Sequence, residues 1–137
     1  MAEEKKEKKE TKGIKEPKES MDLFECIATR RSIRKFMDVD VPMELVGRIL
    51  DAGRYAPSSG NVQNWRFILV KNQETINKIA EGAMQQLWIA EAPIVIIVCA
   101  ETEKLKRFYG VRGERLYSVQ NCSAAIQNML LAAHAVG

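Results

Sequence analysis

Two short segments of the chain concentrate side chains that could recognise a small phosphorylated molecule. Residues 30–36 read Arg-Arg-Ser-Ile-Arg-Lys-Phe and combine four cationic groups with a hydroxyl. Residues 57–65 read Pro-Ser-Ser-Gly-Asn-Val-Gln-Asn-Trp and supply hydroxyl and amide groups before an aromatic residue. A cationic anchor followed by a hydrogen-bonding loop suits a flat cofactor that carries a phosphate and has polar edges. Together the two segments predict a site of that kind.

The first of these, called the Arg segment (residues 30–36), offers planar guanidinium groups that bind phosphate through several hydrogen bonds. In irregular backbone, two of the three arginines and the hydroxyl could converge on one phosphate; these residues are Arg30, Arg31, Ser32 and Arg34. A helix would place Arg30 and Arg34 on one face. The alternative is a basic surface patch that complements the C-terminal dipole of a preceding helix.

The second segment, called the polar loop (residues 57–64), offers side-chain donors and acceptors at Ser58, Ser59, Asn61 and Gln63. Gly60 permits a turn with positive φ. The alternative is that Pro57 ends a helix and the loop merely leads into the next strand. Trp65, at the strand entry, is predicted to be a packing residue.

Apolar spacing predicts the elements that position these segments. We expect a short helix that starts near residue 21 and runs into the Arg segment, a helix over 42–56, a strand over 67–70, a helix over 74–83, a strand over 94–99 and a helix from about 117. Residues 85–90 prolong the third helix or form a short one of their own. The charged stretch at 101–116 is expected to be a surface loop or a partly helical excursion.

The last predicted helix is apolar on almost every side after residue 122, which indicates burial all round. In so small a domain we expect a second subunit to supply part of that cover; the alternative is one central helix inside a monomer. Two strands make a thin sheet for so much apolar helix. We therefore expect the chain to be the N-terminal part of a longer fold.

Composition bounds the remaining possibilities. The 137 residues fit one domain, and a formal net charge of +3 is too weak to indicate a dedicated nucleic-acid binder. Residues 1–20 are rich in interleaved Lys and Glu and predict a disordered charged tail, which leaves 21–137 as the folded domain. A tail that tethers the protein to RNA or a membrane is a weaker alternative, because Glu interrupts the lysines.

The sequence offers little for metal or nucleophilic catalysis. Its cysteines, at positions 26, 99 and 122, form no Cys-x-x-Cys motif, and its single histidine is His134. No metal site is expected, and no catalytic acid or base can be named. There is neither an apolar run long enough for a transmembrane helix nor a signal peptide pattern, so we expect a cytoplasmic protein with no membrane partner.

Four motifs, in this order, resemble the nitroreductase family of FMN-dependent oxidoreductases over residues 21–137. They are R-R-S-I-R-K-F, A-P-S-S-G-N-V-Q-N-W-R-F-I-L-V, A-P-I-V-I-I-V-C-A and A-A-I-Q-N-M-L-L-A-A-H-A-V-G. The resemblance implies an α+β fold: a three-layer α/β/α domain with a central mixed sheet. It also implies a homodimer with two FMN molecules at its interface.

The resemblance also implies roles for particular residues. The FMN phosphate and ribityl chain would be held by Arg30, Arg31, Ser32 and Arg34. The isoalloxazine ring would meet the loop of the other subunit, at Pro57, Ser58, Ser59 and Asn61. Gln85 matches loosely an amide that some members place near the ring. Asn64 stands where the family usually has a proline.

The activity implied is hydride transfer from NAD(P)H through FMN to a nitroaromatic, a quinone or a similar small acceptor, with ping-pong kinetics. Family members continue beyond the position of Gly137 into further strands and another basic residue. A second hypothesis is therefore a catalytically incomplete module that binds flavin or dimerises without turnover.

Overall fold

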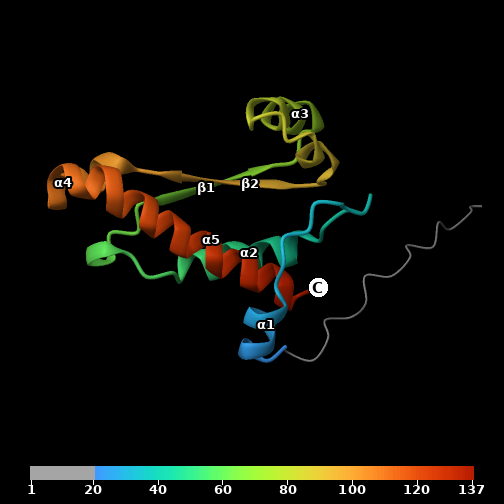
Figure 1. Ribbon diagram of the computed structural model, residues 1–137, viewed down its shortest axis with the longest axis horizontal. Coiled ribbons are helices and arrows are strands. Elements are labelled where there is room, and N and C mark those ends of the chain that lie inside the picture. The colour runs from blue at the N-terminus through green and yellow to red at the C-terminus, as the bar shows by residue number, and fades with distance from the viewer. Residues whose placement is uncertain (1–20) are drawn as a thin grey trace, which may run out of the picture.

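The computed structural model describes residues 21–137, and the predicted tail lies outside them (Figure 1). The helices are α1 (Leu23–Thr29), α2 (Met43–Arg54), α3 (Gln73–Gly82), α4 (Thr102–Arg112) and α5 (Ser118–Ala135). The strands are β1 (Trp65–Val70) and β2 (Val95–Ala100), and short helical turns are η1 (Ser59–Asn61), η2 (Leu87–Glu91) and η3 (Gly113–Tyr117).

Side-chain caps fix where two of the helices, α1 and α3, begin. The Asp22 carboxylate caps α1 by accepting hydrogen bonds from the backbone N–H groups of Phe24, at 2.9 Å, and Glu25, at 3.2 Å. The Asn72 side chain caps α3 in the same way, by accepting from the Thr75 N–H at 2.9 Å. Left-handed backbone at Met84 and Gln85 then ends this helical stretch, so η2 is a separate short turn.

β1 and β2 pair antiparallel, in a register that runs from Trp65 opposite Ala100 to Val70 opposite Val95. Figure 1 shows α2 and α5 on one side of this pair and α3 on the other. The arrangement is α+β, as predicted. β1 begins two residues before its predicted range, at Trp65, and β2 is shifted by one residue so that it ends at Ala100. Trp65 and Ala100 are paired with each other across the sheet.

The core lies between α5 and the sheet. Its buried residues are Ala56, Trp65, Cys122 and Ala125, with Phe67, Val98 and Ala124 packed against them. Trp65 is only 7% exposed, which agrees with its predicted packing role. The opposite side of α5 is uncovered in a single chain, since Ile126 remains 40% exposed and Leu130 44%. One chain alone therefore does not bury α5 on all sides.

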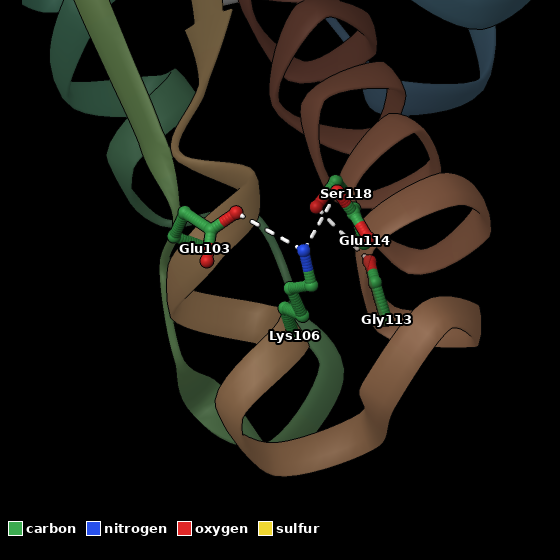
Figure 2. A network of polar contacts seen from close by, with 5 residues as sticks. All are labelled: Glu103, Lys106, Gly113, Glu114 and Ser118. Carbon is green, nitrogen blue, oxygen red and sulfur yellow. Dashed lines mark hydrogen bonds and ion pairs between the residues drawn. The ribbon is translucent and has the colours of Figure 1, made fainter.

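Of the two expectations for 101–116, the helical one is confirmed: α4 is kinked at Gly110, where φ is 58° and ψ −147°, and the wider turn η3 follows it. Most side chains of α4 face solvent, and Leu105 is its buried residue, which explains the weak apolar pattern. Figure 2 shows how the helix is joined to η3: Lys106 Nζ lies 3.4 Å from Glu103 Oε1 and 3.3 Å from Glu114 Oε1. The Ser118 hydroxyl donates to the Gly113 carbonyl at 3.0 Å.

The close crossing of α2 over α5 depends on Gly53. A Cβ atom there would lie 2.8 Å from Met129 Cγ and 3.0 Å from Phe67 Cζ. Overpacking costs about 1–3 kcal/mol, and the helix propensity of alanine offsets about 1 kcal/mol of it. We expect Gly53→Ala to lower the free energy of unfolding by about 1 kcal/mol, measured by urea denaturation.

Gly47 on the same helix provides the control for this prediction. A Cβ atom at Gly47 would have no neighbour within 4 Å, so Gly47→Ala should gain about 0.5–1 kcal/mol. Equal stability of the two variants would show that the crossing tolerates a methyl group.

Candidate functional site

The Arg segment leaves α1 as extended backbone. Arg30 ends the helix with φ −58° and ψ 128°, so Arg30 and Arg34 do not share a helical face. The Arg34 guanidinium lies over the Trp88 ring, 5.5 Å from its centroid. Among residues 21–137, no carboxylate is within ion-pair distance of Arg30, Arg31 or Arg34. Within the described part of the chain, no carboxylate neutralises their positive charge, which suits an anionic ligand.

The space beside the Arg segment is a groove of about 630 Å³. Arg30, Arg31 and Lys35 border it together with one carboxylate, Asp40. Its other walls are mainly apolar residues of the segment 33–42, with smaller shares from α2, from residues 92–94 before β2 and from the end of α5. A groove with cations at its rim and apolar walls suits an amphiphilic anion.

The polar loop folds into a compact turn held by its own hydrogen bonds. Gly60, Asn61 and Gln63 all have left-handed backbone, with φ of 57°, 55° and 49°. The Asn61 N–H donates to the Ser58 carbonyl at 3.0 Å, and the Gln63 N–H donates to Ser58 Oγ at 3.0 Å. Left-handed backbone is uncommon for non-glycine residues, so two such residues in one loop indicate a strictly imposed conformation.

The loop is fastened to α5 by a residue that the sequence analysis missed, Asn121. Its Oδ1 accepts hydrogen bonds from the Ser59 N–H at 3.0 Å and the Ser59 hydroxyl at 3.2 Å. Its Nδ2 donates to Asn64 Oδ1 at 2.8 Å. A signal for it was present: Asn121 precedes Ala125 and Met129 by one and two helical turns, so it shares their buried face.

Asn64 is completely buried and joins the loop to two elements. Besides its bond to Asn121, its carbonyl accepts from the Glu101 N–H at 2.7 Å. The Glu101 carboxylate in turn pairs with Lys104 and, at 2.9 Å, with Arg66. The hydrogen bond from Lys104, and after it the one from Arg66, lower the pKa of Glu101 below its ordinary 4.5.

This pKa shift predicts an acid-dependent contribution to stability. Because the pKa of Glu101 is lower in the folded chain than in the unfolded one, its stabilising effect is present above about pH 4.5 and declines as pH falls toward the folded value. We expect Glu101→Gln to reduce the slope of unfolding free energy against pH below about pH 4.5, measured by denaturation at several pH values. An unchanged slope would contradict the assignment.

The two predicted binding segments lie far apart within one chain (Figure 1). α1, which leads into the Arg segment, contacts the C-terminal end of α5: Thr29 Oγ1 lies 2.8 Å from His134 Nε2. The polar loop is bonded to Asn121 near the N-terminal end. At 1.5 Å of rise per residue, these α5 positions are about 20 Å apart.

The sheet places the segments at opposite ends as well. The polar loop leads into Trp65, which pairs with the last residue of β2, Ala100. Arg34 instead contacts Trp88 of η2, which precedes the first residues of β2. Gln85 lies in the turn just before η2, at the Arg34 end and away from the loop. One chain therefore does not bring the Arg segment and the polar loop together.

Other kinds of site find no support in the described part of the chain. Residues 21–137 hold no group of three or more His, Cys, Asp or Glu side chains that could bind a metal ion. No helix in this range is long and apolar enough to cross a membrane. Burial raises the pKa of the Cys122 thiol, which disfavours the reactive thiolate.

The model of the nitroreductase family matches residues 27–91 and 82–137. The chain belongs to the nitroreductase family. A relative from Methanothermobacter thermautotrophicus, whose name combines NADH dehydrogenase and NAD(P)H nitroreductase, is 44% identical over 119 residues. The match covers 85% of this chain and 58% of the relative. The FMN reductase [NAD(P)H] of Bacillus subtilis is 35% identical over 85 residues, covering 62% of this chain and 34% of that protein.

Solved nitroreductase-type structures agree with the fold. The NADPH:FMN oxidoreductase of Vibrio harveyi, complexed with NAD⁺, gives a TM-score of 0.74 at 28% identity and covers 83% of this chain and 52% of that one. The nitroreductase α+β fold is thereby confirmed. This chain spans about three fifths of the length of the archaeal relative, so it holds one part of the family's fold.

Proposed function

We propose that this protein is an FMN-dependent oxidoreductase of the nitroreductase type. It would take hydride from NAD(P)H and reduce a nitroaromatic, a quinone or a similar small acceptor. The observation that carries the proposal is the combination of three arginines without carboxylate partners among residues 21–137 and a polar loop with left-handed backbone at Gly60, Asn61 and Gln63. The arginines offer charge-assisted hydrogen bonds to a flavin phosphate, and the loop offers hydroxyl and amide groups to a flavin ring. The names of the Bacillus and Vibrio relatives support FMN and NAD(P)H as the molecules involved.

The donor set of the chain fits FMN. Arg30, Arg31 and Arg34 with Ser32 would hold the phosphate and ribityl chain, because all are free of competing ion pairs among the described residues. The polar loop would orient the ring through Pro57, Ser58, Ser59 and Asn61. FMN, when bound, supplies the hydride-accepting chemistry. Donor and acceptor would use the same face in turn, which gives ping-pong kinetics.

We further propose that two chains complete each FMN site. The Arg segment and the polar loop of one chain are separated by most of the length of α5, so a single cofactor would meet one segment from each subunit. The uncovered apolar side of α5, at Ile126 and Leu130, is available for the contact between subunits.

The absorption spectrum of the purified protein tests the proposal. We expect flavin bands after addition of FMN, together with quenching of flavin fluorescence, and we expect NADH or NADPH to bleach those bands. A protein that shows no bound flavin after FMN addition would refute the proposed function.

The second candidate is a flavin-binding or dimerisation module without turnover. The match spans 58% of the archaeal relative, and this candidate concerns what that part of the fold does by itself. Bound FMN that NADH and NADPH both fail to reduce would select this candidate over the oxidoreductase.

A further inference from the structure

We propose that Asn121 is the positioning residue of the polar loop: it sets the loop conformation on which FMN affinity depends. This inference rests on the proposed function for its FMN component. Asn121 lies on α5, and it contacts the polar loop at Ser59 and again at Asn64. Its two contacts therefore bracket the residues with left-handed backbone, Gly60, Asn61 and Gln63.

The direction of each hydrogen bond follows from one fixed donor. The backbone N–H of Ser59 can only donate, so the Asn121 atom facing it must be the carbonyl oxygen. The Asn121 amide nitrogen then faces Asn64 and requires an acceptor there, which is Asn64 Oδ1 at 2.8 Å. A carboxamide satisfies both contacts because it accepts at one atom and donates at the other.

Burial makes these bonds difficult to replace. Asn121 is 4% exposed and Asn64 is fully buried, so water has little access to either end of the pair. The Asn64 Nδ2 atom, on the far side of that amide, has no partner among the described residues. One buried amide pair between residues 57 positions apart in sequence therefore joins the loop to α5, in addition to the Ser59 contacts and the loop's own hydrogen bonds.

The strained backbone of the loop explains why its conformation requires the hydrogen bonds from Asn121. Asn61 and Gln63 adopt φ of 55° and 49°, and Gly60 is covered by the hydroxyl of Tyr109. Such conformations persist only when their surroundings impose them. Without Asn121 the segment would relax toward ordinary φ values. The side chains proposed to meet the flavin ring, Ser58 and Asn61, would then change direction.

Three variants separate positioning from general stability. Asn121→Leu removes both contacts to the loop. Asn128→Leu is the matched control, because Asn128 lies two turns along the same helix and its Nδ2 donates at 3.1 Å to Ala52 of α2 instead. Asn121→Asp is the conservative variant: its carboxylate accepts from Ser59, and Asn64 can invert its amide so that Nδ2 donates to it.

Two measurements on the full chain test the proposal: the FMN dissociation constant by fluorescence titration, and deuterium exchange of residues 57–64. We expect Asn121→Leu to weaken FMN binding at least tenfold and to speed exchange in this range by a similar factor. We expect Asn128→Leu to stay within about twofold of the parent, and Asn121→Asp within about threefold.

The outcomes are distinguishable. Unchanged exchange in Asn121→Leu would overturn the positioning role, whatever FMN does. Faster exchange with unchanged FMN affinity would overturn the link between loop conformation and flavin binding, and so would equal losses of affinity in the Leu variants at positions 121 and 128. If the parent chain binds no FMN, the proposed function fails, and exchange alone then decides whether Asn121 holds the loop.

Discussion

Replacing Gly113 by alanine is expected to lower the free energy of unfolding by about 3 kcal/mol, near the upper end of overpacking costs. Gly113 is buried at the junction of α4 and η3. A Cβ atom there would lie 2.9 Å from the Leu105 carbonyl carbon and 2.8 Å from Tyr109 Cβ, with the Leu105 oxygen closer still. Because two of these three atoms belong to the backbone, α4 itself would have to move.

The loss is measurable as a shift of the thermal unfolding midpoint by roughly 10 °C. Gly82→Ala is the control, since a Cβ atom at Gly82 in α3 would meet nothing within 4 Å. The ion pairs of Lys106 and the Ser118 hydrogen bond in Figure 2 surround the same junction. A Gly113→Ala protein as stable as Gly82→Ala would show that this junction is loosely packed.

Mixing two defective variants is expected to restore FMN binding that neither shows alone. One variant, Arg30→Ala/Arg31→Ala, would lose the proposed charge-assisted bonds to the FMN phosphate, worth about 1.5–3 kcal/mol each, and so at least tenfold in affinity. The other, Gly60→Val, places a side chain at φ 57° and against the Tyr109 hydroxyl, which distorts the polar loop.

The recovery follows from the proposed sharing of each FMN site between two subunits. In a mixed dimer, one site combines the intact Arg segment of one chain with the intact loop of the other, while the second site carries both defects. Random assortment after joint refolding should restore about a quarter of the sites, counted by flavin absorbance after gel filtration. Two Arg-segment variants mixed together serve as the control and should restore none. No recovery in the first mixture would refute sharing between subunits.

The two experiments probe contacts of different range: Gly113 meets residues four and eight positions before it, whereas the proposed FMN site joins segments of two chains. The order of helices and strands was readable from local pattern, because apolar periodicity acts within a turn or two of backbone. The α+β fold class came from the resemblance to a family, and the cap at Asn72 was seen only in the structure. At 101–116 the sequence left a surface loop and a partly helical segment open, and the structure decided for the kinked helix α4. Exposed helices with one buried residue, here Leu105, carry little apolar signal.

The candidate site also has features that the sequence predicts and features that only the structure shows. The sequence by itself determined which groups are available: the cations of the Arg segment, and the hydroxyls and amides of the polar loop. Only the tertiary structure decided that these groups lie at opposite ends of α5, and that Asn121 fastens the loop through Ser59 and the buried Asn64. The physical reason is the distance along the chain over which each effect acts. Residue type sets what a side chain can bind, whereas packing of α5 on the sheet sets which distant partner it meets.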